Sequence, residues 1–174
     1  MQKKEWRAEM KRRIALLSEG ERLSLSESLF DRIEQMEEFQ TAHYILLYWS
    51  LPDEPFSHAL LERWSDKKLI LPAVVGDEIV LRRYRDKEDM KVGSFHIMEP
   101  IGPAFSDYDC LDLTLIPGLS FDADGYRLGR GKGYYDRLLP KLKCMTIGVC
   151  FPCQYEDKLP HDEWDIPVKR VVCR

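Results

Sequence analysis

The sequence predicts a single α/β domain in which a largely parallel β-sheet is flanked by helices. Helical patterns alternate along the chain with short apolar runs of strand length, the order expected of βαβ units. These runs are almost continuously apolar, as in strands that are buried on both faces of a parallel sheet. A chain of 174 residues that is 44% hydrophobic and 32% charged suits one domain over residues 1–174.

Two helices are expected at the N-terminus. In the first, over residues 3–17, apolar side chains recur every three or four positions from Trp6 to Leu17. Ser18 and Glu21 have the spacing of a capping box, which opens the second helix. The buried face of this second helix is expected to consist of Leu25, Leu29, Ile33 and Met36, widened by Leu23 and Phe30.

The remaining elements follow from apolar runs and chain breakers. Short helices are expected at about 56–64, after Pro55, and at about 134–139, before Pro140. The stretch 85–108 contains glycine and proline but little periodicity, and we expect an extended connection that lies over the site. Strands are predicted over residues 43–49, 68–75, 78–84, 111–116, 144–150 and 168–173.

The stretch between the predicted strand 111–116 and the helix that follows it is rich in glycine. Gly129, Gly131 and Gly133 alternate with Arg130 and Lys132. Glycine allows the backbone to approach a ligand, free N–H groups leading into a helix bind anions, and cations add charge-assisted hydrogen bonds. A solvated basic loop is the alternative, but the alternation between strand and helix favours phosphate binding. The spacing matches neither the Walker A loop nor the GxGxxG dinucleotide loop.

Residues 117–137, PGLSFDADGYRLGRGKGYYDR, resemble the signature of the 5-formyltetrahydrofolate cyclo-ligases, also called 5,10-methenyltetrahydrofolate synthetases. Every fixed position of that signature is occupied. The resemblance implies a cytoplasmic ligase that uses ATP and Mg²⁺ to convert 5-formyltetrahydrofolate to 5,10-methenyltetrahydrofolate, ADP and phosphate. It implies that the formyl oxygen is phosphorylated and that N10 closes the ring. The family fold is an α/β sandwich of the ribose-5-phosphate isomerase and CoA-transferase type.

The resemblance also implies roles for individual residues. Arg130 and Lys132 would be catalytic, and Asp136 and Asp165 would bind magnesium. Plain core packing of Trp49, a helix-start charge at Glu54 and a solvated helix flank at Lys3 and Arg7 remain the alternative interpretations. The implied ATP-binding residues are Lys3, Arg7, Arg127, Leu128, Gly129, Arg130, Gly131, Lys132, Gly133, Tyr134 and Tyr135. The implied folate-binding residues are Trp49, Glu54, Arg130, Gly131, Lys132, Gly133 and Tyr134.

Composition and charge argue against several other classes of protein. A net charge of −4 argues against a general nucleic-acid binder, and no apolar run approaches the ~20 residues of a membrane span. The N-terminus lacks the apolar core of a secretory signal, and five scattered cysteines are expected to be reduced cytoplasmic thiols. We expect a monomer. Two other functions stay open: an isomerase or CoA transferase on the same scaffold, and a non-catalytic nucleotide- or RNA-binding module.

Overall fold

The computed structural model, which describes residues 2–174, is built around a six-stranded sheet of order β11-β9-β6-β1-β2-β3. All neighbouring strands are parallel except β3, which runs antiparallel to β2. The predicted α/β class and largely parallel sheet are therefore confirmed. The sheet strands are β1 Tyr44–Leu46, β2 Lys68–Val75, β3 Glu78–Arg83, β6 Leu113–Pro117, β9 Met145–Val149 and β11 Arg170–Val172.

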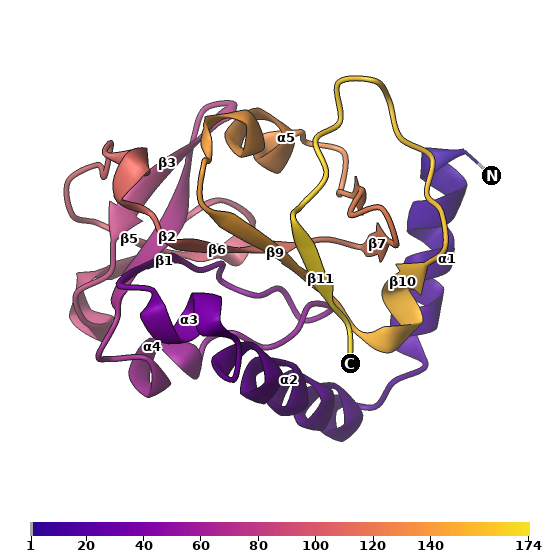
Figure 1. Cartoon of the computed structure of the whole chain (residues 1–174), viewed down its shortest axis with the longest axis horizontal. Coiled ribbons are helices and arrows are strands. Elements are labelled where there is room, and N and C mark those ends of the chain that lie inside the picture. The colour runs from indigo at the N-terminus through magenta and orange to yellow at the C-terminus, as the bar shows by residue number, and fades with distance from the viewer. Residues whose placement is uncertain (1) are drawn as a thin grey trace.

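Helices lie on both faces of this sheet (Figure 1). Helices α2, α3 and α4 lie along one face and α5 lies on the other, whereas α1 stands beside the small strands β7 and β10. The helices are α1 Lys3–Ala15, α2 Glu19–Glu34, α3 Glu37–Thr41, α4 Leu60–Arg63 and α5 Tyr134–Leu138. Short 3₁₀ turns are η1 Lys87–Asp89, η2 Ser94–His96, η3 Tyr108–Cys110, η4 Leu139–Lys141 and η5 Pro152–Gln154.

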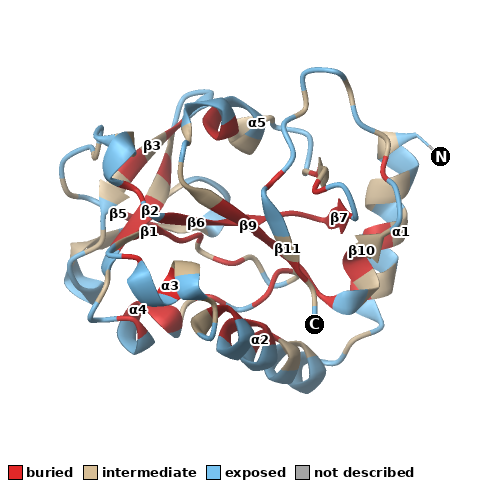
Figure 2. Ribbon diagram, in the orientation of Figure 1, coloured by how far each residue is buried: buried red, intermediate tan, exposed pale blue. Residues whose placement is uncertain are grey.

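Buried apolar side chains form a core on each face of the sheet. Ile45 and Leu47 point toward the α2 side, and Leu46 joins the cluster under α5. Strand β6 is buried along its whole length, which explains why all its residues but Thr114 are apolar (Figure 2). Burial of such strands supplies the main driving force for folding, at roughly 25 cal/mol per Å² of apolar surface.

The capping box predicted before the second helix is present. Ser18 Oγ accepts a hydrogen bond from the Glu21 backbone N–H at 3.2 Å, and Glu21 Oε2 accepts one from the Ser18 N–H at 2.7 Å. Leu29, Phe30 and Ile33 are buried as expected, but Leu23 is 42% exposed, so its assignment to the buried face was wrong. The next helix, α3, had not been predicted.

The chain after β1 leaves the sheet earlier than predicted. The strand expected over 43–49 is limited to Tyr44–Leu46, and the helix expected over 56–64 to Leu60–Arg63. Side chains hold the intervening segment in place. Ser57 Oγ donates to the Tyr48 carbonyl at 2.5 Å, and the Ser57 N–H donates to Ser50 Oγ at 2.9 Å. These bonds satisfy backbone groups that a strand or helix would otherwise pair.

Two small sheets were missed by the sequence analysis. Strands β7 Ser120–Asp122 and β8 Arg127–Leu128 lie within the glycine-rich motif and pair with each other, and β10 Tyr155–Glu156 pairs with β7. The stretch expected as an extended connection contains a hairpin of β4 Met90–Val92 and β5 Met98–Pro100. Among the helices of residues 2–174, none is long and apolar enough to cross a membrane.

Candidate active site

A cavity of about 390 Å³ lies where the segments following β1 and β6 meet the glycine-rich turn. This is the carboxyl edge of the parallel strands, where ligands of α/β proteins bind. Its walls are mainly apolar and aromatic, with a few charged groups among them. The lining residues are Tyr48, Trp49, Leu51, Glu54, Pro72, Val74, Ile79, Phe95, Ile97, Glu99, Pro117, Gly118, Arg127, Arg130, Lys132, Gly133, Tyr134 and Tyr135.

The glycine turn depends on conformations that only glycine adopts without strain. Gly131 has φ 98° and Gly133 has φ 72°, and Gly133 directly precedes α5. Lys132 and Gly133 both line the cavity. The lysine is exposed, with its Nζ 5.8 Å from the centre of the Phe95 ring. The turn thus presents backbone and a cation at the mouth of the cavity.

Arg130 joins this turn to two acids that follow β1. Its Nη2 lies 2.5 Å from Asp53 Oδ1 and 3.0 Å from Glu54 Oε1. Glu54 is buried, and its second oxygen accepts the Leu51 N–H at 2.9 Å. Burial raises the pKa of Glu54, although the charge of Arg130 opposes the shift. The helix-start alternative for Glu54 does not hold, because Glu54 lies outside any helix and faces the cavity.

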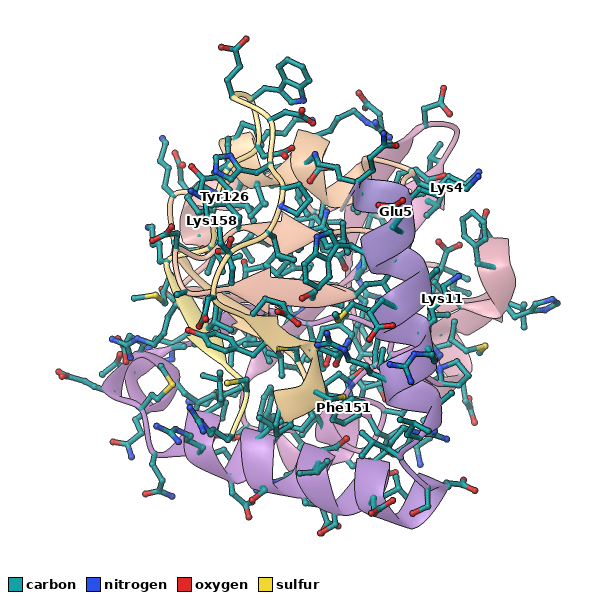
Figure 3. All side chains as sticks on the ribbon, turned by 90° about the vertical axis from the view of Figure 1, so that its right-hand side faces the viewer. Lys4, Glu5, Lys11, Tyr126, Phe151 and Lys158 are labelled. Atoms are coloured by element: carbon teal, nitrogen blue, oxygen red, sulfur yellow. The ribbon has the colours of Figure 1, made fainter. Side chains whose placement is uncertain are left out.

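Helix α1 reaches the glycine turn through one side of its surface. Arg7 Nε donates to the Gly129 carbonyl at 2.8 Å. Lys3, one turn earlier, is paired with Asp162 at 2.6 Å and with Asp165 at 2.8 Å. By contrast, Lys4 and Lys11 of the same helix are exposed (Figure 3). Lys3 and Arg7 are therefore not a solvated flank, and both lie on the side of α1 that faces the rest of the chain.

The two acids predicted to bind magnesium are each paired with a cation. Asp136 accepts from Arg127 Nη2 at 2.9 Å, and Asp165 is bound to Lys3. Lys3 and the Asp162 backbone N–H lower the pKa of Asp165 against the opposing effect of burial. Within residues 2–174, no group of three or more His, Cys, Asp or Glu side chains could hold a metal ion. Neither acid is among the residues that line the cavity, and Mg²⁺ that arrives bound to phosphates requires only one or two protein carboxylates.

The aromatic residues of the predicted site contribute unequally. Trp49 lines the cavity and stacks on His58, with 3.6 Å between the ring centres. Tyr134 and Tyr135 are half-buried, and both line the cavity. The side chain of Leu128, in contrast, is buried in the core. A ligand contact of Leu128 is therefore restricted to its backbone.

Several residues that build the site were missed by the sequence analysis. Phe95 and Glu99, from the β4–β5 hairpin, line the cavity, and no local motif marks either. The buried Asp122 carboxylate accepts the N–H groups of Asp124, Tyr126 and Leu159 and so fixes the first half of the motif. A signal for Asp122 was available, because an aspartate three residues before a glycine is typical of a turn.

Two solved structures are similar to this protein over almost its whole length. A solved structure of Aquifex aeolicus 5,10-methenyltetrahydrofolate synthetase is 41% identical, with a TM-score of 0.89, over 99% of this chain and 90% of that one. The Mycoplasma pneumoniae 5,10-methenyltetrahydrofolate synthetase superposes with a TM-score of 0.77 at 26% identity, over 99% and 98%.

Curated relatives carry the same designation. The 5-formyltetrahydrofolate cyclo-ligase of Mus musculus is 30% identical over 95% of this chain and 90% of its own. That of Escherichia coli strain K12 is 30% identical over 75% and 78%. The profile of the 5-formyltetrahydrofolate cyclo-ligase family matches residues 1–174. With that match over the whole chain, the protein belongs to the 5-formyltetrahydrofolate cyclo-ligase family.

Proposed function

We propose that this protein converts 5-formyltetrahydrofolate and ATP to 5,10-methenyltetrahydrofolate, ADP and phosphate, with Mg²⁺ as cofactor. The single observation that carries the proposal is the cavity itself. It joins a buried acid, Glu54, to the cation Lys132 on a glycine turn, so that one space offers an acceptor for a folate ring and donors for a phosphate. Its volume of about 390 Å³ is in the range of small-molecule sites.

The chemistry requires activation of a poor leaving group. The formyl oxygen attacks the γ-phosphorus of ATP and ADP departs, which leaves a phosphorylated iminium at N5. N10 then attacks the formyl carbon and loses its proton. The C–O bond breaks, phosphate leaves, and the product carries a positive charge shared between N5 and N10. Catalysis of phosphoryl transfer consists mainly of positioning and charge neutralisation.

The residues of this chain supply both. Lys132 and Arg130, with the N–H groups of the glycine turn, would hold the transferring phosphate, and Arg7, fixed on the Gly129 carbonyl, would border it. Glu54 would accept hydrogen bonds from the pteridine, and Trp49 and Tyr134 would pack against its rings. Asp136 and Asp165 would hold Mg²⁺, which neutralises phosphate charge when bound.

The remaining expectations belong to the same proposal. We propose one domain, because the central sheet takes its strands from residues 44 to 172. We also propose a monomer that acts in the cytoplasm, where the five cysteines, all free thiols here, would stay reduced.

The decisive experiment is a methenyltetrahydrofolate absorbance assay with purified protein. We expect product only when 5-formyltetrahydrofolate, ATP and Mg²⁺ are all present. Turnover without ATP would favour an isomerase or transferase on this scaffold. Nucleotide binding with no turnover would favour a non-catalytic module. Either result would overturn the proposed function.

A further inference from the structure

Glu99 is a second buried acid in the cavity, and no role has been assigned to it above. It lies on β5, is 4% exposed and lines the cavity. One carboxylate oxygen, Oε2, accepts the Val74 backbone N–H at 2.5 Å. The other, Oε1, makes no hydrogen bond to any residue between 2 and 174. In that part of the chain, Arg127 Nε is the one fully enclosed side-chain nitrogen or oxygen without a partner. Glu99 Oε1 is therefore not fully enclosed, and Glu99 is one of the residues that line the cavity.

The fold makes specific room for this carboxylate. A Cβ atom added to Gly93 would lie 1.7 Å from Glu99 Oε1 and 2.1 Å from its carboxyl carbon. Any other residue at position 93 would therefore displace the Glu99 side chain or the hairpin. Gly93 and Glu99 are diagonal neighbours on the hairpin, since Glu99 pairs with Lys91 and the Gly93 N–H donates to the Ile97 carbonyl at 2.8 Å. The observed position of the Glu99 carboxylate thus depends on the absence of a side chain at Gly93.

The two buried acids differ in charge compensation. Glu54 is paired with Arg130, whereas Glu99 takes part in none of the ion pairs formed among residues 2–174. The cavity wall near Glu99 is apolar, with Val74 beside it and Ile97 two residues earlier on the same hairpin. A carboxylate without a cation in such surroundings favours a positive charge brought in by the ligand.

We propose that Glu99 is a ligand-binding residue whose free carboxylate oxygen stabilises the positive charge that the folate acquires as its ring closes. This inference rests on the proposed function. The substrate is neutral at its formyl group, whereas the methenyl product is cationic at N5 and N10. A fixed negative charge in an apolar wall therefore interacts more strongly with the product, and with the transition state that leads to it, than with the substrate.

Glu99→Gln tests the proposal, because it removes the charge but keeps the side-chain size and an acceptor for the Val74 N–H. The matched control is Glu88→Gln, which removes a charge from an exposed residue just before the same hairpin. Equilibrium dissociation constants are measured for 5-formyltetrahydrofolate and for 5,10-methenyltetrahydrofolate, together with kcat. The ratio of the two constants is insensitive to any fraction of protein that fails to fold.

In Glu99→Gln we expect affinity for the methenyl product to fall about tenfold or more and kcat to fall with it, while affinity for the 5-formyl substrate changes less than about threefold. The control should match the wild type. An unchanged ratio overturns the inference, whether both affinities fall equally, as for an acid that only accepts pteridine N–H groups, or neither falls. A wild-type protein that forms no methenyl product contradicts the proposed function instead, so the two failures are distinguishable.

Discussion

Arg130 and Glu54 lie 3.0 Å apart although they are 76 positions apart in the chain. The contact connects the glycine turn, which is placed to bind phosphate, to the buried acid that is placed to bind folate. Burial lowers the pKa of Arg130, but Asp53 and Glu54 outweigh this effect and raise it overall. The arginine is therefore a permanent cation that holds the two halves of the site together.

The two ends of the cavity should respond differently to substitution. Lys132→Ala removes a cation from the phosphate end and should raise KM for ATP or lower kcat by about tenfold or more, since hydrogen bonds to charged groups contribute about 1.5–3 kcal/mol. Glu54→Gln should mainly raise KM for 5-formyltetrahydrofolate, because an amide accepts fewer hydrogen bonds than a carboxylate. Lys141→Ala, an exposed lysine beyond α5, is the control. Small and equal effects of both substitutions on both substrates would return Lys132 and Glu54 to surface or structural roles.

The metal assignment can be tested on the two paired acids. Asp136→Asn and Asp165→Asn should each raise the Mg²⁺ concentration that gives half-maximal rate, with the larger effect for Asp136, because a Mg²⁺ ligand orients the phosphates. Asp162→Asn is the matched control, since Asp162 shares Lys3 with Asp165 but was not predicted to bind metal. If Asp136→Asn keeps the wild-type Mg²⁺ dependence, or if Asp162→Asn changes it as much as Asp165→Asn, the metal site lies elsewhere.

Glu54 should give the folate affinity a pH dependence. Because burial raises the pKa of Glu54 above 4.5, Glu54 becomes protonated at a higher pH than an ordinary glutamate. KM for 5-formyltetrahydrofolate should therefore rise as the pH falls through the raised pKa. This rise in KM at low pH should be absent from Glu54→Gln, measured over the same pH range. A rise in KM that persists unchanged in the variant is caused by titration of the substrate or of another group.

The same shift affects stability, with the opposite sign from that of an acid whose pKa falls on folding. The folded protein holds the Glu54 proton more tightly than the unfolded chain does. Its contribution to stability is therefore present at pH values below 4.5 and is lost as the pH rises through the folded pKa. The free energy of unfolding of Glu54→Gln should increase relative to the wild type as the pH rises above 4.5 and through the raised pKa. A constant difference in urea titrations across this range would show that the pKa is not raised.

Features set by local rules could be read from the sequence. The capping box at Ser18 and Glu21 formed as predicted because its hydrogen bonds join residues three apart. Gly131 and Gly133 adopt positive φ angles, a conformation that glycine takes without strain. The apolar runs predicted the parallel sheet because strands buried on both faces need apolar residues throughout. The motif over residues 117–137 indicated the family, because a residue of the required type occupies every fixed position of the signature.

Features that depend on distant segments could be decided only by the tertiary structure. Arg7 meets the Gly129 carbonyl across 122 positions, and Lys3 meets Asp165 across 162, so neither contact leaves a local pattern. Glu99 faces the cavity because β4 and β5 pair and Gly93 makes room for it, while the sequence around it shows little periodicity. Local spacing determines which backbone each segment adopts. Which buried charge finds a partner, and which stays open to a ligand, is determined by packing between segments far apart in the chain.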